Sequence, residues 1–88
     1  MSSDGFAPPA RYELVTRAGC HLCHDMAVLL DAVLPAYGLT WKPVDVDGSP
    51  TLRLRYGEAV PVLLRDGKPV AKVRVDRSEL ERIVRRRR

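Results

Sequence analysis

The apolar residues of this chain alternate with polar ones in some segments and recur every three or four positions in others, which predicts strands and helices respectively. Residues 11–16 are rich in β-forming residues and are predicted to be the first strand. Helical spacing then runs from Cys20 to Gly38, which predicts a long amphipathic helix whose last turn Pro35 loosens. The apolar stripe of this helix is predicted to comprise Leu22, Met26, Leu29, Leu30, Val33, Leu34 and Tyr37.

The segment after this helix predicts an edge strand and a short helix. Residues 39–46 include β-branched and aromatic residues and form the second predicted strand. Pro43 lacks a backbone N–H donor, which places this strand at an edge of the sheet. The turn at residues 47–50 contains an N-cap candidate, and a short helix over residues 51–56 is predicted to follow it and to stop at Gly57.

The last third of the chain predicts a β-hairpin and a closing helix. Residues 60–65 are a continuous apolar run typical of a buried strand, and residues 69–75 are predicted to return beside them. Asp66-Gly67 between the two runs is a strong signal for a tight hairpin turn. A final helix is predicted to follow, with a narrow apolar face and two N-cap candidates, Asp76 and Ser78.

The predicted order β-α-β-α-β-β-α indicates an α/β fold with a four-stranded mixed sheet flanked by helices. A right-handed βαβ unit followed by a hairpin places the first strand in the centre of the sheet, parallel to the second strand and antiparallel to the third. The residues after the first strand then lie at its carboxyl end, which is where open α/β sheets build their functional sites.

Length and composition indicate one globular domain. The chain has 88 residues, of which 45% are hydrophobic, and no apolar run approaches the roughly 20 residues that a membrane-spanning helix needs. We expect residues 1–10 to form a flexible leader, residues 11–84 to form the domain and residues 85–88 to form a basic tail. The leader lacks the basic and apolar regions of a secretory signal, so we expect a cytoplasmic protein. We also expect a monomer that does not bind membranes.

The net charge of +4 is carried by the end of the chain. There are 15 Lys and Arg residues against 11 Asp and Glu residues, and four of the 15 are the terminal arginines 85–88. A terminal basic cluster suits the negative pole of a helix dipole. No aromatic residues interleave with these arginines to make a stacking platform, so we do not expect a nucleic acid partner.

Two cysteines, the only ones in the chain, lie at the start of the long predicted helix as Cys20 and Cys23. At this spacing on a first helical turn the two sulfurs face each other within bonding distance, which predicts a reversible disulfide. The helix N-terminus, the adjacent His21 and Arg17 three residues upstream are each expected to lower the pKa of Cys20. We therefore expect Cys20 to be the nucleophile and Cys23, which lies further into the helix, to be the more buried resolving thiol.

These residues resemble the glutaredoxin-like family of the thioredoxin-fold superfamily. The resemblance covers residues 12–84 and is carried by the first strand, by residues 17–23 with both cysteines, by residues 44–47 and by residues 59–63. It implies a thioredoxin-like fold and a dithiol–disulfide oxidoreductase without a bound cofactor. The implied substrates are protein or low-molecular-weight disulfides, with glutathione as a candidate co-substrate.

The resemblance also implies roles for residues outside the cysteine pair. It implies a cis Val60–Pro61 peptide bond opposite the cysteines, with Val60 and Pro61 contacting the substrate. It assigns Arg17 and Asp76 to substrate binding as well. The chain departs from the usual pattern in having His21 and Leu22 between the cysteines instead of Pro and Tyr, and in having Arg74-Val75 instead of Gly-Gly before Asp76.

Three other functions compete with this interpretation. Cys20, Cys23 and His24 also match Cys-x-x-Cys-His, the attachment motif of c-type haem, but Met26 is too close on the same helix to be the second axial ligand. Zinc needs four ligands, and the chain has no second pair of cysteine or histidine ligands, so we expect no metal. An iron–sulfur cluster shared across a dimer is a further metal-binding alternative. A redox-inactive adaptor with the same fold is the third alternative, which the reactivity of Cys20 distinguishes.

Overall fold

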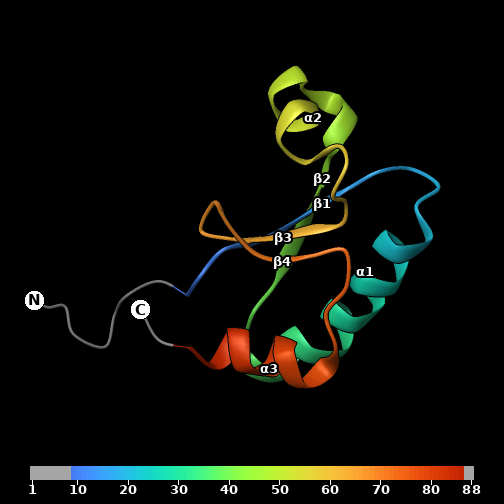
Figure 1. Ribbon diagram of the computed structural model, residues 1–88. Coiled ribbons are helices and arrows are strands. Elements are labelled where there is room, and N and C mark those ends of the chain that lie inside the picture. Colours follow the sequence, from blue (N-terminus) through green and yellow to red (C-terminus); the bar gives the residue numbers. More distant parts are fainter. Residues whose placement is uncertain (1–8, 87–88) are drawn as a thin grey trace, which may run out of the picture.

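The computed structural model describes residues 9–86 and shows a four-stranded sheet with helices on both faces (Figure 1). The order of strands and α-helices is the predicted β-α-β-α-β-β-α, which confirms the α/β class. The elements are β1 (Tyr12–Thr16), α1 (His21–Val33), the 3₁₀ helix η1 (Leu34–Tyr37), β2 (Trp41–Asp45), the 3₁₀ helix η2 (Val46–Gly48), α2 (Pro50–Tyr56), β3 (Val62–Arg65), β4 (Lys68–Lys72) and α3 (Arg77–Arg85).

The sheet has the order β2-β1-β3-β4, with β1 parallel to β2 and antiparallel to β3. This arrangement confirms the central position predicted for the first strand. It also confirms the edge position of β2, where Pro43 lies opposite Leu14. The hairpin between β3 and β4 turns at Asp66 and Gly67, whose φ angles of 52° and 84° are those that a tight two-residue turn requires.

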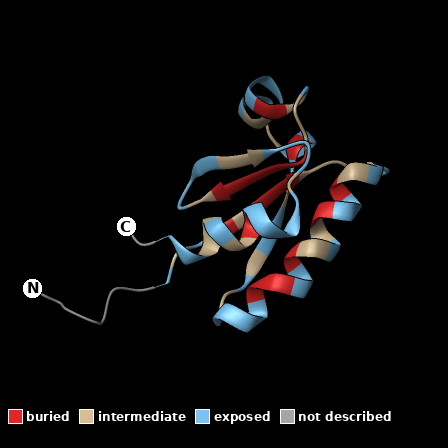
Figure 2. Cartoon of the chain, turned by 60° about the horizontal axis from the view of Figure 1, so that its bottom comes forward, coloured by how far each residue is buried: buried red, intermediate tan, exposed pale blue. Residues whose placement is uncertain are grey.

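Buried residues lie along the strands and on the helix surfaces that face the sheet (Figure 2), and they form one core on each face of the sheet. Leu14 and Leu63 pack with Leu30 of α1 and Leu80 of α3, all of them almost fully buried. On the opposite face, strand residues pack against α2; this second cluster is Val15, Val46, Tyr56, Val62 and Leu64. Helices α1 and α3 therefore cover one face and α2 covers the other.

Helix α1 buries most of the predicted stripe, although Leu22 and Leu29 are only half-buried. Met26, Leu30 and Val33 are buried, whereas Tyr37, predicted to pack, has 37% of its surface exposed. The chain changes from an α-helix to the 3₁₀ helix η1 just before Pro35, which confirms that the proline loosens the last turn. The tighter 3₁₀ geometry changes the direction of the later side chains and explains the exposure of Tyr37.

The fourth strand was predicted too long. It ends at Lys72 instead of continuing to residue 75, because Val73 has a left-handed φ of 65°. The N–H of Arg74 donates to the carbonyl of Lys72 at 2.6 Å, and the N–H of Val73 donates to the carbonyl of Pro61 at 2.7 Å. The chain therefore leaves the sheet at a tight turn that is hydrogen-bonded to the segment before β3.

The two ends of the chain are described only in part. Arg85, assigned to a basic tail, is the last residue of α3, and residues 87–88 lie outside the described part of the chain. Most of the predicted leader, residues 1–8, also lies outside it, whereas Ala10 packs against the core. No helix within residues 9–86 is long and apolar enough to cross a membrane.

Candidate redox site

A β-turn places Cys20 at the start of α1. The N–H of Cys20 donates to the carbonyl of Arg17 at 3.2 Å, and Gly19 inside this turn has a φ of 76°. A side chain disfavours that left-handed conformation, which explains a glycine directly before the first cysteine. Cys20 itself has extended backbone angles and is the N-cap residue of α1.

Cys20 and Cys23 are joined by a disulfide, with their Cα atoms 5.2 Å apart. The N–H of Cys23 also donates to Cys20 Sγ at 3.1 Å, so this sulfur occupies the position of an N-cap acceptor. In the reduced protein the same N–H and the helix dipole favour a negative charge on Cys20 Sγ. Cys20 is half-buried and only 3% of Cys23 is exposed, which confirms that Cys23 is the more buried of the two.

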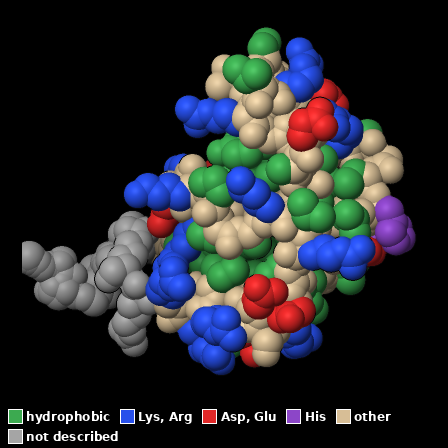
Figure 3. Space-filling view, in the orientation of Figure 1, with side chains coloured by type: hydrophobic (Ala, Val, Ile, Leu, Met, Phe, Trp, Pro, Cys, Tyr) green, Lys and Arg blue, Asp and Glu red, His purple; other side chains and the backbone are tan. Residues whose placement is uncertain are grey.

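The two histidines lie on the exposed side of α1, and a histidine projects from the edge of the molecule (Figure 3). The His21 side chain is 86% exposed, and its Nε2 lies 3.5 Å from Asp25 Oδ2 one turn further along the helix. The influence of His21 on Cys20 therefore stays a prediction.

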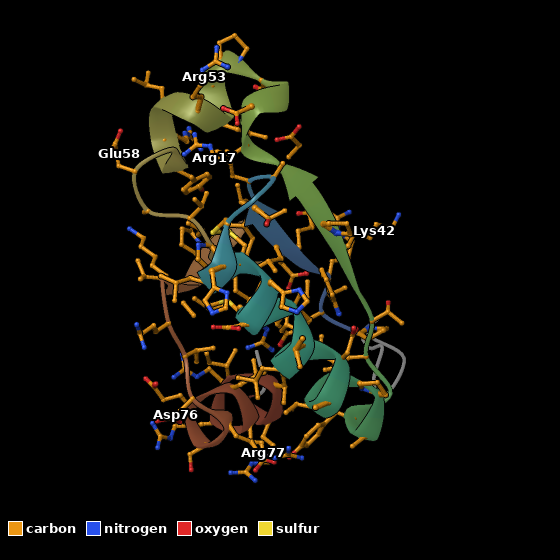
Figure 4. The ribbon with its side chains drawn as sticks, turned by 90° about the vertical axis from the view of Figure 1, so that its right-hand side faces the viewer. Arg17, Lys42, Arg53, Glu58, Asp76 and Arg77 are labelled. Atoms are coloured by element: carbon orange, nitrogen blue, oxygen red, sulfur yellow. A yellow bond between two sulfur atoms is a disulfide. The ribbon has the colours of Figure 1, made fainter. Side chains whose placement is uncertain are left out.

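Arg17 connects the turn before Cys20 to the α2 side of the molecule through hydrogen bonds. Its Nε and Nη2 donate to Asp47 Oδ2 and Oδ1 at 3.0 and 3.3 Å, and its Nη1 donates to the carbonyl of Gly57 at 3.0 Å. Figure 4 shows Arg17 beside α2, near Arg53. The hydrogen bonds from Arg17 to the Asp47 carboxylate, followed by the charges of Arg17 and Arg53, lower the pKa of Asp47, and the same hydrogen bonding raises the pKa of Arg17.

Asp47 contributes to the site, although the sequence analysis assigned it no role. The parallel pairing of β1 and β2 could have indicated its position, because the segments that follow two parallel strands leave the sheet at the same edge. Arg17 follows β1, and Asp47 lies in η2 directly after β2. Arg53 Nη1 lies 3.9 Å from Asp47 Oδ1, which adds a second cation to this carboxylate.

The Val60–Pro61 peptide bond is cis, as the family resemblance implied. Pro61 is buried and its carbonyl accepts the N–H of Val73, while Val60 packs partly against the core on the α2 side. The roles of Val60 and Pro61 in contacting a substrate stay predictions.

Asp76 is the N-cap of α3. Its Oδ1 accepts the N–H of Glu79 at 2.8 Å, and Glu79 Oε1 accepts the N–H of Asp76 at 3.3 Å, which completes a capping box. Of the two predicted caps, Asp76 is therefore the one used, and Ser78 lies within the helix. Figure 4 shows Asp76 at the far end of the site from Arg17.

Two cavities flank the first turns of α1. The one we name the β2-side pocket, of about 490 Å³, is lined by both cysteines together with Leu14, Ala27, Trp41 and Pro43 and by more polar residues at its rim. The one we name the α3-side groove, of about 360 Å³, is lined by Leu22, Asp25, Met26, Val73, Asp76 and Glu79, among others. Of the residues that line the β2-side pocket, the sequence assigned functional roles only to Arg17, His21 and the cysteines, and to His24 in the alternative haem motif.

Charged groups are scarce inside the described domain. None of the polar or charged residues among residues 9–86 is fully buried, so no carboxylate lies in the core beneath Cys23. Over the same residues, no three His, Cys, Asp or Glu side chains are grouped as they would be to hold a metal ion. On the face shown in Figure 3, the basic side chains are spread around the surface instead of gathering into one patch.

Known proteins are similar to this chain in sequence and in fold. A family model described as a glutaredoxin-like domain (DUF836) matches residues 11–85. Uncharacterized proteins of Mycobacterium tuberculosis and Mycobacterium bovis are 37% identical over 73 residues, which is 77% of this chain and 75% of each relative.

Solved structures of other proteins are similar to this chain in fold. A structural genomics target from X. campestris aligns with a TM-score of 0.71 and 27% identity, covering 84% of this chain and 95% of that one. Protein Ne2328 of Nitrosomonas europaea aligns with a TM-score of 0.76 and 23% identity over 96% of this chain and 99% of that one. A thioredoxin from Halobacterium salinarum aligns with a TM-score of 0.62 and 22% identity, covering 85% of this chain and 71% of that one. The chain has the thioredoxin fold and belongs to the glutaredoxin-like (DUF836) family.

Proposed function

We propose that the protein is a dithiol–disulfide oxidoreductase whose reactive pair is Cys20 and Cys23. The observation that carries the proposal is the disulfide at the N-terminus of α1, in which Cys20 is half-buried and Cys23 is almost fully buried. This asymmetry suits one accessible nucleophile and one protected resolving thiol. The cap hydrogen bond from the N–H of Cys23 supports the ionised form of Cys20 in the reduced protein.

The reaction takes place in two exchange steps. The Cys20 thiolate attacks one sulfur of a substrate disulfide, so that a bond forms between Cys20 and that sulfur while the other substrate sulfur leaves as a thiolate. Cys23 then attacks Cys20 Sγ, the Cys20–Cys23 bond forms, and the second substrate sulfur leaves. The substrate disulfide is thereby reduced to two thiols, and the protein dithiol is oxidised to a disulfide.

The second step requires Cys23 to lose its proton. No carboxylate is buried within residues 9–86 to accept this proton, so water or His24, which lines the same pocket as Cys23, is the proposed acceptor. The departing substrate thiolate takes a proton from solvent, which balances the reaction.

The proposed substrates are protein or low-molecular-weight disulfides, with glutathione as a co-substrate and the cytoplasm as the compartment. Val60, Pro61, Arg17 and Asp76 are proposed to contact the substrate. The position of Asp76 on the α3-side groove supports this proposal. Arg17 and His21, which line the β2-side pocket with Cys20, are proposed to tune that sulfur.

Serine variants of the two cysteines test the function. Cys20→Ser is expected to abolish turnover, because a hydroxyl is not ionised at neutral pH. Cys23→Ser is expected to accumulate a mixed disulfide on Cys20, visible as an adduct in the intact mass. Ala18→Ser places a serine in the same exposed turn without removing a sulfur and is the matched control. Turnover by Cys20→Ser equal to that of wild type would refute the proposal and favour an adaptor whose thiols do no chemistry.

A further inference from the structure

The β2-side pocket lies on a different side of the disulfide from the α3-side groove. Both cysteines line the β2-side pocket, and neither lines the α3-side groove. Val60 and Pro61 are not among the residues of either cavity. Both cysteines therefore border a cavity that Val60, Pro61 and Asp76 do not line.

The shape of the β2-side pocket follows from the packing of its walls. Leu14 and Pro43 are paired across β1 and β2, and both line the cavity. Trp41 forms another wall, where its Nε1 donates to Asp31 Oδ1 of α1 at 2.9 Å and holds the indole in place. On the helix side the lining includes Ala27, whose side chain is a single methyl group.

The chemistry of the β2-side pocket differs from that of the α3-side groove. The apolar part of its lining is Leu14, Ala27, Trp41 and Pro43, its polar part is Thr16, Arg17, His21 and His24, and no carboxylate is among the residues that line it. The α3-side groove, by contrast, is lined by three carboxylates, those of Asp25, Asp76 and Glu79. A volume of about 490 Å³ lies within the range of small-molecule sites, about 300–1,000 Å³.

We propose that the β2-side pocket binds a low-molecular-weight thiol with an apolar, ring-sized body that packs against Trp41 and carries its sulfur to the disulfide. The proposal rests on the exchange function proposed above and names a substrate class for it. The thiolate attacks Cys20 Sγ, a mixed disulfide forms, and Cys23 leaves as a thiolate. A second thiolate then attacks the bound sulfur, which releases the small disulfide and the Cys20 thiolate. Two small thiols are thereby oxidised, and the protein disulfide is reduced.

Binding can be measured separately from redox chemistry. Trp41 is the only tryptophan, so its fluorescence reports on the pocket. The probe is 5-(methylthio)-2-nitrobenzoate, a thioether that quenches indole fluorescence and does not exchange, added to the oxidised full-length protein. We expect saturable quenching, weakened about tenfold, equivalent to about 1.4 kcal/mol, in Ala27→Leu, whose isopropyl group fills the cavity. Ala32→Leu makes the same change at an exposed position of the same helix and is expected to bind the probe like wild type. Equal binding by Ala27→Leu, or quenching that does not saturate, would overturn the proposal.

A measurement on the unmodified protein covers the case in which Ala27→Leu does not fold. In the ¹H–¹⁵N spectrum of the oxidised protein the probe is expected to shift the amide signals of Thr16, Ala27 and Trp41. Shifts confined to Val73 and Asp76 would place the probe in the α3-side groove and contradict the proposal.

Exchange rates separate failure of this proposal from failure of the proposed function. Reduction of the disulfide by 5-thio-2-nitrobenzoate is expected to slow more in Ala27→Leu than reduction by 2-mercaptoethanol does, and Ala32→Leu is expected to change neither rate. Equal slowing with both thiols would refute the pocket as a selective site. If neither thiol reduces any of the proteins, the exchange function fails, and saturable quenching still decides whether the pocket binds the probe.

Discussion

Replacing Asp76 separates the structural role that this residue has from the substrate-binding role proposed for it. Asp76→Ala removes the 2.8 Å hydrogen bond from the N–H of Glu79 and leaves the backbone N–H of residue 76 able to reach the Glu79 side chain. The loss of one N-cap costs about 1 kcal/mol, within a range of about 0.5–2 kcal/mol. For a domain of this size, a loss of about 1 kcal/mol lowers Tm by about 4–8 °C.

Serine at this position retains a cap acceptor but removes the carboxylate. In urea unfolding followed by circular dichroism, Asp76→Ser is therefore expected to recover most of the stability lost in Asp76→Ala. Ser78→Ala is the control, because Ser78 is not the N-cap, and its free energy of unfolding is expected to stay within about 0.5 kcal/mol of wild type.

The two roles of Asp76 then diverge in activity. If the carboxylate contacts the substrate, Asp76→Ser slows glutathione-dependent turnover while remaining as stable as expected for a capped helix. The capping argument is refuted if Asp76→Ala unfolds at the wild-type urea concentration, or if Ser78→Ala loses as much stability as Asp76→Ala.

Two further predictions concern stability. Leu80 is fully buried in α3, so Leu80→Ala is expected to lower the free energy of unfolding by about 2–5 kcal/mol. Leu54 is 88% exposed, so Leu54→Ala is expected to change the free energy of unfolding by no more than about 0.5 kcal/mol. Similar losses in the two variants in urea unfolding would contradict this packing. Because Arg17 lowers the pKa of Asp47 in the folded protein, the stability gained from the Asp47 carboxylate is present above the ordinary aspartate pKa and is lost as the pH falls through the folded value. The stability advantage of wild type over Asp47→Asn is therefore expected to narrow on acidification, and an advantage that grows in acid would contradict the assignment.

Features that depend on local chemistry were predictable from the sequence. The three-residue spacing of the cysteines predicted the disulfide, and Asp66-Gly67 predicted the hairpin because both residues tolerate the left-handed backbone that the turn requires. Pro43 predicted the edge strand because it has no N–H to donate. Each of these signals lies within a few residues, so no distant partner had to be known.

Features that depend on distant partners were not predictable. The strand-like composition of residues 69–75 gave no sign that Val73 adopts a left-handed backbone, a conformation that accompanies its hydrogen bond to Pro61. Arg17 was expected to act on Cys20, yet its hydrogen bonds go to Asp47, 30 residues away, and to Gly57. The β2-side pocket likewise requires residues of α1, β1 and β2 to meet in space.

The most direct test of the exchange chemistry is a redox titration of the full-length protein in glutathione buffers, with alkylation and intact mass after each equilibration. A reversible Cys20–Cys23 couple predicts a single two-electron transition between unlabelled and doubly labelled protein, and brief alkylation of the reduced protein should label Cys20 before Cys23. Labelling that is the same at every glutathione ratio, or equal labelling of the two sulfurs at early times, would contradict the account.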